Sequence, residues 1–294
     1  MNYSFIIPHK DSQEFLYKCI ESIPIRDDIE IIVVDDNSDN KEFDEKYLKN
    51  HNAKLILSHE SITAGGARNL GLKAANGKWI LFADADDFYT EGFINELDKY
   101  VESENDIVYF DVEDKYHKYV NLDRIHQAIL RHNEEDVFYL RYRVTNIWLK
   151  MFRLAFLKSW NIQFERAEVG NDVLFAMLTS YLAKQIVFLP CKLYAYTWHP
   201  NNTTYKKRTA EQNVRNYINL LKLNYFLKKI NAKNFQRSLG KFILRIIKRD
   251  GLIQFVRFTF ILLSKLKSIK HEEKEYIQIL CTINPKLLLK FDIK

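Results

Sequence analysis

The chain of 294 residues is poor in cysteine and lacks any long apolar run. Its three cysteines, Cys19, Cys191 and Cys281, are far apart and have no metal-type spacing. Such a sparse, odd set argues against a disulfide framework and favours buried thiols in a reducing compartment. No stretch approaches 18 uninterrupted apolar residues, so we expect no membrane-spanning helix. The apolar run at residues 3–8 is too short for a secretory signal, and we expect the fold to begin there.

Several catalytic motifs are also missing. The chain has no GxGxxG fingerprint of dinucleotide-binding folds and no GxxxxGK[ST] phosphate loop. No Ser-His-Asp or Cys-His arrangement stands out, which argues against a covalent nucleophile. The classes of enzyme that depend on these motifs are therefore disfavoured.

What the chain does have is ample apolar content and an uneven distribution of charge. Hydrophobic residues make up 47% of the sequence, enough for a full globular core. The formal net charge of +6 hides two opposite halves: residues 201–294 carry 21 Lys and Arg against 6 Asp and Glu. That segment has a net charge of +15, while residues 1–200 have a net charge of −9. Two segments with such different charge indicate two different roles.

Strand-like and helix-like patterns alternate over roughly the first 110 residues. We expect strands at Tyr3–Ile7, Glu30–Val34, Lys54–Leu57, Lys78–Phe82 and Asp106–Asp111, and helices at Gln13–Ile23, Asp44–Asn50, Ala64–Asn76 and Glu91–Val101. This alternation predicts an α/β fold with a parallel, doubly wound sheet. Further along we expect a helix at Asp172–Ala183 and strands at Ile186–Leu189 and Lys192–Trp198. The pattern then becomes largely helical and basic, so we predict domains 1–204 and 205–294.

Two acidic clusters follow predicted strands. Asp35 and Asp36 come after the second strand, and Asp84, Asp86 and Asp87 come after the fourth. In open α/β sheets, ligands bind at the carboxyl ends of strands. Clustered carboxylates there repel one another unless a cation or a hydroxyl-rich ligand lies between them, and such hard oxygen ligands favour Mg²⁺ or Mn²⁺. The alternative is that these aspartates only cap turns.

Four of the eight glycines fall within 13 residues. Gly65 and Gly66 open a predicted helix that carries Arg68. Backbone could approach a ligand there while the guanidinium reaches a phosphate or carboxylate. The alternative is that these glycines serve helix packing alone.

Four segments, in this order and spacing, resemble the successive signatures of family 2 glycosyltransferases. They are Ile6-Ile7-Pro8, Val33-Val34-Asp35-Asp36-Asn37-Ser38, Gly66-Ala67-Arg68-Asn69-Leu70-Gly71 and Phe82-Ala83-Asp84-Ala85-Asp86-Asp87. The resemblance covers roughly residues 2–204 and implies the GT-A fold, a Rossmann-like, mostly parallel sheet with an Asp-x-Asp motif. The remaining chain would then be a helical, basic extension. Lys10-Asp11 departs from the Tyr-Asn common in the family at this place.

The resemblance also implies roles for single residues at the donor site. Pro8 would form part of the floor of the base pocket, and Asp36 would hydrogen-bond the nucleotide base. Arg68 would lie near the nucleotide or its phosphates. Asp84 would contact ribose or metal, and Asp86 would hold a divalent ion, Mn²⁺ or Mg²⁺, on the diphosphate.

Three later segments resemble the family as well. Gly170-Asn171-Asp172 matches its Glu-Asp pair before a helix, with Asn in place of Glu, so the catalytic base would be Asp172; the alternative is a helix N-cap. His199, in Trp198-His199-Pro200-Asn201-Asn202-Thr203, would complete the metal or phosphate site, or it is structural. Trp148 lies in a stretch that resembles one near acceptor sites, and it would stack on a sugar or belong to the core.

These implied roles describe an inverting transfer from a nucleotide diphosphate sugar, with UDP the expected nucleotide. The acceptor would be a hydroxyl of a glycan or a lipid-linked molecule, with bacterial surface polysaccharide as the expected product. Two alternatives are a non-catalytic nucleotide-sugar binding protein and a sugar-phosphate nucleotidyltransferase. The latter usually has a Gly-rich basic loop after its first strand, which Pro8-His9-Lys10-Asp11 does not provide.

The basic C-terminal segment has an amphipathic pattern. Lys241, Arg245, Lys248 and Arg249 alternate with apolar residues at helical spacing, and residues 252–263 are nearly all apolar. This pattern fits a helix in the interface of an anionic membrane, and so a peripheral enzyme on the cytoplasmic face. The alternative is a helical domain packed on the catalytic part. No nucleic-acid partner is expected, because no recognition motif accompanies the charge.

Overall fold

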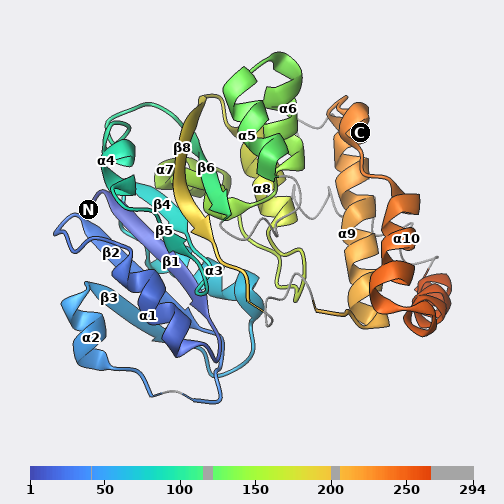
Figure 1. The fold of residues 1–294 in the computed structure, drawn as a ribbon, viewed down its shortest axis with the longest axis horizontal. Coiled ribbons are helices and arrows are strands. Elements are labelled where there is room, and N and C mark those ends of the chain that lie inside the picture. The colour runs from blue at the N-terminus through green and yellow to red at the C-terminus, as the bar shows by residue number, and fades with distance from the viewer. Residues whose placement is uncertain (41, 115–121, 200–205, 266–294) are drawn as a thin grey trace. The chain divides into compact units, whose positions relative to one another are not determined.

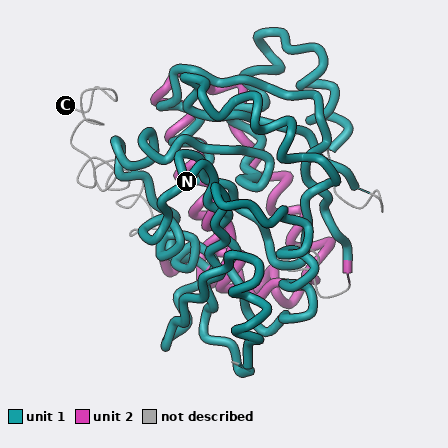
Figure 2. The backbone as a smooth tube through the Cα atoms, turned by 90° about the vertical axis from the view of Figure 1, so that its left-hand side faces the viewer, with its two compact units in different colours: residues 1–167, 174–198 teal, residues 168–173, 199–294 magenta. Residues whose placement is uncertain are grey.

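A computed structural model describes residues 1–40, 42–114, 122–199 and 206–265. The chain forms two compact units, coloured separately in Figure 2. The first comprises residues 1–167 and 174–198, and the second comprises residues 168–173 and 199–294. The domain boundary that we predict between residues 204 and 205 lies outside the described residues.

The first unit is built on a curled, mixed sheet (Figure 1). In the described part of the chain its order is β3-β2-β1-β4-β7-β6-β8-β5. The strands are β1 (Tyr3–His9), β2 (Ile29–Asp35), β3 (Ala53–Leu57), β4 (Trp79–Phe82), β5 (Phe88–Tyr89), β6 (Ile107–Asp114), β7 (Lys150–Arg153) and β8 (Ile186–Tyr196). Strands β1 to β4 are parallel, as are β6 and β8, whereas β7 runs antiparallel to β4 and β6, and β5 to β8. The predicted mostly parallel α/β fold is confirmed, with β5 and β7 as antiparallel additions.

Two strands continue through a proline where the sequence predicted an end or a gap. β1 includes Pro8, which pairs with Val34 of β2. On its other side, β1 pairs with β4 only as far as Ile6, so Pro8 lies beyond the end of β4. Proline is tolerated there because the missing N–H faces no partner strand. β8 is one strand, not two, and its register against β6 shifts between Leu189 and Lys192, so Pro190 occupies a bulge.

Helices flank this sheet. They are α1 (Gln13–Glu21), α2 (Glu45–Asn50), α3 (Thr63–Ala74), α4 (Phe93–Asp98), α5 (Leu122–Arg131), α6 (Glu134–Arg143), α7 (Leu154–Trp160) and α8 (Val173–Leu182), with a 3-10 turn η1 (Ile147–Leu149). α3 packs closely on β1: a Cβ added to Gly71 would lie 2.4 Å from Ile6 Cγ2. The close packing of α3 on β1 therefore requires glycine at this position.

The second unit is helical. α9 (Ala210–Lys229) begins with a capping box made by Thr209 and Gln212, and is followed by η2 (Lys233–Phe235), α10 (Leu239–Asp250) and a helix over residues 252–265. These helices share a small core of Ala210, Val214, Ile246 and Phe258. Within the described residues, no helix is long and apolar enough to cross a membrane.

Candidate active site

The polar residues that we single out gather at one edge of the sheet. β1, β2 and β4 are adjacent and parallel, so their carboxyl ends lie on the same side. Pro8 and His9 end β1, Asp36 follows β2, and Asp84 follows β4. This is the edge at which open α/β sheets bind ligands.

At the end of β2, Asp35 has a structural role. It is fully buried and accepts hydrogen bonds from the backbone N–H of Ser38 (3.0 Å), from the Ser38 hydroxyl and from His9 Nδ1 (2.9 Å). His9 Nε2 accepts from Ser12 N–H (3.1 Å), so the neutral ring carries its proton on Nδ1. Burial disfavours the carboxylate, but these hydrogen bonds outweigh it and hold the pKa of Asp35 below its ordinary value. Asp35 thus closes the turn after β2, as our alternative interpretation expects.

Asp36 organises the start of α3. Its Oδ1 accepts hydrogen bonds from the backbone N–H groups of Ile62 (2.5 Å) and Thr63 (3.1 Å). Thr63 has a φ of +64°, a left-handed conformation that is costly for a β-branched residue and typical of functional sites. Its Oγ1 is buried and has no hydrogen-bond partner among the residues that the structure describes. Thr63 is therefore a further candidate for contact with a ligand, which no sequence motif indicated.

Arg68 and Asp84 form an ion pair. Arg68 Nη2 lies 2.6 Å from Asp84 Oδ1, and the guanidinium lies 5.6 Å from the centroid of the Phe164 ring. Arg68 is only 6% exposed, whereas Asp84 is half-buried. A buried cation is thus held beside the turn that carries the Asp-x-Asp pair, where it can face an anionic ligand.

Asp84 to Asp87 form a tight turn, closed by a hydrogen bond from Asp87 N–H to Asp84 O (3.0 Å). Asp86 is half-buried, but Asp87 is buried, and its carboxylate accepts from Tyr194 Oη–H (2.9 Å) and Thr197 N–H (2.6 Å). Burial, followed by the neighbouring charges of Asp86 and Asp84, raises the pKa of Asp87 well above its ordinary value. A cation bound at this turn would relieve that repulsion.

Tyr194 connects β8 to both ends of the turn, because its hydroxyl also accepts from Asp84 N–H (3.0 Å). Its ring stacks on Trp148, with centroids 4.9 Å apart and an interplanar angle of 18°. Trp148 is 6% exposed and belongs to the core cluster. Of our two alternatives, a core position and stacking on a sugar, this supports the core position. Nothing in the sequence around Tyr194 indicated this role, because the contact spans more than 100 residues.

The turn offers oxygen ligands only. Among the described residues, no group of three or more His, Cys, Asp or Glu side chains is placed to hold a metal ion. Mg²⁺ is commonly held by one or two carboxylates together with substrate phosphates. Two carboxylates such as Asp84 and Asp86 would therefore suffice for a divalent ion only if a diphosphate supplied its remaining ligands.

The other two predicted site residues belong to the second unit. Asp172 is half-buried directly before α8, next to the buried Asn171. The loop packs on α9, since a Cβ added to Gly170 would lie 3.4 Å from Asn219 Nδ2 and 3.5 Å from Asn216 Oδ1. His199 is half-buried at the start of the longer segment of that unit, and residues 200–203 of its motif lie outside the described residues.

Known proteins share this sequence pattern and fold. The family model described as "Glycosyl transferase family 2" matches residues 4–165. Poly(ribitol-phosphate) beta-N-acetylglucosaminyltransferase TarS of Staphylococcus aureus is 29% identical over 207 residues, which is 67% of this chain but only 35% of TarS. The chain thus spans about one third of the length of that relative.

Solved structures agree on the fold. TarS 1–349 in complex with UDP-GlcNAc superposes with a TM-score of 0.64 at 20% identity, covering 96% of this chain and 80% of that one. The mannosyltransferase PcManGT from Pyrobaculum calidifontis, in complex with GDP-Man and Mn²⁺, gives a TM-score of 0.57 at 14% identity, covering 98% and 87%. These structures show the fold alone, whereas the family model covers more than half of the chain, and the chain therefore belongs to glycosyl transferase family 2.

Proposed function

We propose that this protein is an inverting glycosyltransferase that moves a sugar from a UDP-sugar to a hydroxyl of a glycan or lipid-linked acceptor. The observation that carries the proposal is the Arg68–Asp84 ion pair beside the Asp84-x-Asp86 turn, at the ligand-binding edge of the sheet. The relative TarS, named for N-acetylglucosamine transfer to poly(ribitol-phosphate), supports a role in bacterial surface polysaccharide synthesis.

The donor would be held by residues of the first unit. Pro8 and Asp36 would border the nucleotide base, and Arg68 would face the phosphates. Asp86, with Asp84, would hold Mn²⁺ or Mg²⁺, which when bound supplies positive charge to the diphosphate leaving group. Arg68 favours departure of the same group, because its charge interacts more strongly with the product diphosphate than with the intact donor.

Asp172 would act on the acceptor. As a half-buried carboxylate before α8, it would take the proton of the attacking hydroxyl while C1 of the sugar is displaced from the diphosphate. One displacement of this kind inverts the anomeric centre. We assign His199 to the metal or phosphate site.

A metal-dependent donor site can be tested by thermal shift, since a bound donor stabilises the folded protein by mass action. We expect UDP-GlcNAc with Mn²⁺ to raise the melting temperature of the parent and of an Asp123→Ala control, in which an exposed aspartate of α5 is removed. Asp86→Ala should abolish both the shift and sugar transfer, and EDTA should do the same to the parent. Full activity of the parent in excess EDTA would refute the metal assignment.

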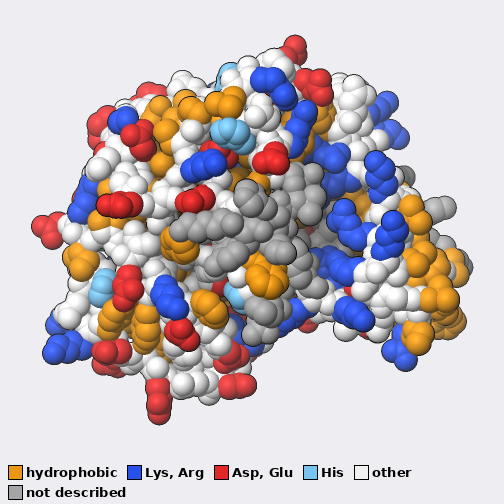
Figure 3. All heavy atoms as spheres, viewed as in Figure 1, with side chains coloured by type: hydrophobic (Ala, Val, Ile, Leu, Met, Phe, Trp, Pro, Cys, Tyr) orange, Lys and Arg blue, Asp and Glu red, His pale blue; other side chains and the backbone are white. Residues whose placement is uncertain are grey.

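We further propose that the second unit holds the enzyme on the cytoplasmic face of a membrane. Five apolar residues in the helix at 252–265 are between 59% and 76% exposed: Leu252, Ile253, Val256, Phe260 and Leu263. On the face shown in Figure 3, Lys and Arg gather on the C-terminal unit, and hydrophobic side chains gather at its edge. Exposed apolar residues beside cations fit a helix in the interface of an anionic membrane.

Vesicle binding tests this surface. The parent should sediment with vesicles that contain phosphatidylglycerol, and salt should weaken the binding because surface charges are screened. Ile253→Ser with Phe260→Ser should release the protein. Leu130→Ser, which removes an apolar side chain of α5 that is 53% exposed, should not. If the parent ignores these vesicles at low salt, the apolar surface has another partner.

A further inference from the structure

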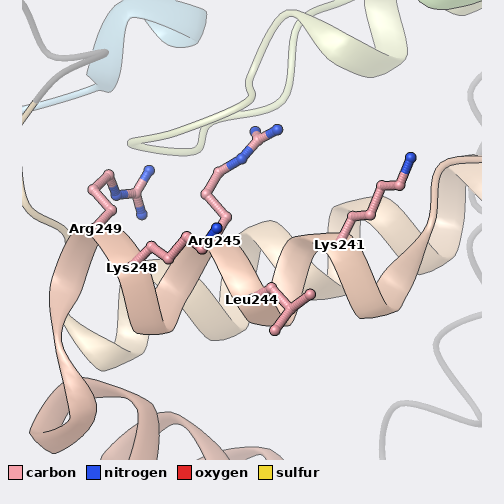
Figure 4. Close-up of a pocket in the computed structure, with 5 residues that line it drawn as sticks. All are labelled: Lys241, Leu244, Arg245, Lys248 and Arg249. Atoms are coloured by element: carbon pink, nitrogen blue, oxygen red, sulfur yellow. The ribbon is translucent and has the colours of Figure 1, made fainter.

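α10 carries a row of cations along one side. Lys241, Arg245 and Arg249 recur every four residues, and Figure 4 shows their side chains extending from the same side of the helix. With Lys248 and Leu244 they line a groove of about 430 Å³. Residues four apart in a helix are separated by about 6 Å along its axis. The row therefore offers positive charge at regular intervals.

The single acid beside this row pairs with Arg249 and leaves Lys241 and Arg245 without it. Between residues 239 and 265 the sequence contains six Lys and Arg and a single acid, Asp250. The carboxylate of Asp250 already has partners. It lies 2.6 Å from Arg249 Nη2, and it accepts hydrogen bonds from Asn213 Nδ2 (2.9 Å) and from the backbone N–H of Arg208 (3.0 Å). Burial disfavours its charged form, but Arg249 and these hydrogen bonds outweigh that effect and lower the pKa of Asp250 to about 2. It is therefore ionised at neutral pH and saturated with donors.

Arg208 adds a further cation to the same neighbourhood. It is half-buried, and its Nε is buried without a hydrogen-bond partner among the described residues. Burial lowers the pKa of Arg208, the charges of Arg249 and Arg245 lower it further, and the charge of Asp250 opposes them. Asp250 compensates part of this charge, but the Arg208 side chain is still desolvated beside two other guanidinium groups, so a further anion would be favourable here.

We propose that this groove binds successive phosphate groups of an anionic acceptor, a chain whose units are joined by phosphodiesters. Guanidinium groups bind phosphate through paired, charge-assisted hydrogen bonds, and a row of them suits a repeating anion better than a single one. Leu244 is 57% exposed in the same groove and offers an apolar contact to the carbon chain between phosphates. The proposal rests on the proposed function, since it names the class of the acceptor.

A direct binding measurement tests the groove without requiring catalysis. A fluorescently labelled, synthetic glycerol phosphate oligomer is titrated with the full-length protein, and anisotropy is recorded. The groove variant replaces three cations: Lys241→Gln, Arg245→Gln and Lys248→Gln. The control variant removes the same charge from exposed lysines of the same unit that do not line the groove: Lys228→Gln, Lys229→Gln and Lys233→Gln.

We expect the groove variant to bind the oligomer about tenfold more weakly or worse, the usual result of losing hydrogen bonds between charged groups. The control should stay within about twofold of the parent, since it keeps these hydrogen bonds. Both variants should bind UDP-GlcNAc like the parent. Equal losses in the two variants would overturn the proposal, because net charge alone would then explain binding.

Two further probes identify the source of the phosphate. If the groove variant loses binding only to vesicles that contain phosphatidylglycerol, the groove serves lipid headgroups and the acceptor assignment is overturned. A single-stranded oligonucleotide that binds as tightly as the oligomer would overturn it as well, since any polyanion would then suffice.

Failure of the proposed function would look different. If the oligomer binds through the groove but no donor is ever consumed, the phosphate site stands and the glycosyltransferase assignment falls. If sugar is transferred to an uncharged glycan at the same rate by the parent and the groove variant, and the oligomer does not bind, only the groove proposal falls.

Discussion

Replacing Tyr194 by phenylalanine isolates the link between β8 and the Asp84–Asp87 turn. The hydroxyl donates to Asp87 Oδ2 and accepts from Asp84 N–H, so its removal leaves two polar groups without this partner. Tyr194 is fully buried, and each group left unsatisfied costs about 1–3 kcal/mol. Asp87 keeps its hydrogen bond from Thr197, and the aromatic stack on Trp148 is retained. We therefore expect a loss of about 2–4 kcal/mol in the free energy of unfolding.

The loss should appear as a fall of about 4–16 °C in melting temperature, given about 2–4 °C per kcal/mol for a domain of this size. Because the turn positions Asp84 and Asp86, the Kd for UDP-GlcNAc with Mn²⁺ should also rise, by about tenfold if 1–2 kcal/mol of this loss is expressed in binding. Burial, with the charges of Asp87 and Asp84, raises the pKa of Tyr194 well above its ordinary value, so the hydroxyl remains a donor throughout the accessible pH range.

Tyr89→Phe is the matched control. Tyr89 is buried in the same aromatic cluster, but its hydroxyl donates to Phe82 O (3.3 Å) and not to the turn. It should lose stability without losing donor affinity. If both variants bind the donor equally well at a temperature where both are folded, Tyr194 only stabilises the fold, and our reasoning about the turn is wrong.

Three other variants probe separate parts of the molecule. Asp172→Asn should keep donor binding but lower kcat by about 10²–10⁴, the usual contribution of a general base, and NMR of the product should show inversion; unchanged turnover would place the base elsewhere. Gly71→Ala should lower the free energy of unfolding by about 1–3 kcal/mol through the clash with Ile6, whereas Gly240→Ala, which meets nothing closer than 3.9 Å, should be neutral or stabilising in the same urea titration. Asp250→Asn should lower the free energy of unfolding by about 2 kcal/mol at pH 7. The pKa of Asp250 is lower in the folded than in the unfolded protein, so its carboxylate stabilises the fold at neutral pH, and this contribution is lost as pH falls from about 4 towards 2. Parent and variant should therefore converge in urea unfolding at low pH, and a constant difference would refute the linkage.

Much of the first unit could be predicted from the sequence, because its signals are local. The apolar runs of β1, β2 and β4 and the turn residues after them specify parallel strands, and parallel strands place Asp36 and Asp84 on one edge. Errors fell where a tertiary contact decided the outcome. Pro8 stays in β1 because β4 ends before it, and Pro190 stays in β8 because the strand bulges against β6.

The sequence by itself determined the fold class, the family pattern and the positions of the Asp-x-Asp pair and Arg68, because strand periodicity and motif spacing are properties of short segments. Tertiary structure alone decided what those side chains contact. Three of these contacts join residues from different elements: the Arg68–Asp84 ion pair, the hydrogen bonds of Asp36 at the start of α3, and those of Tyr194 with the turn. Hydrogen bonds across such separations depend on the packing of the sheet, which no local pattern specifies. The same holds for the cations of α10, because only the structure shows that Asp250 pairs with Arg249 and bonds to Arg208 and Asn213, which leaves Lys241 and Arg245 without that acid.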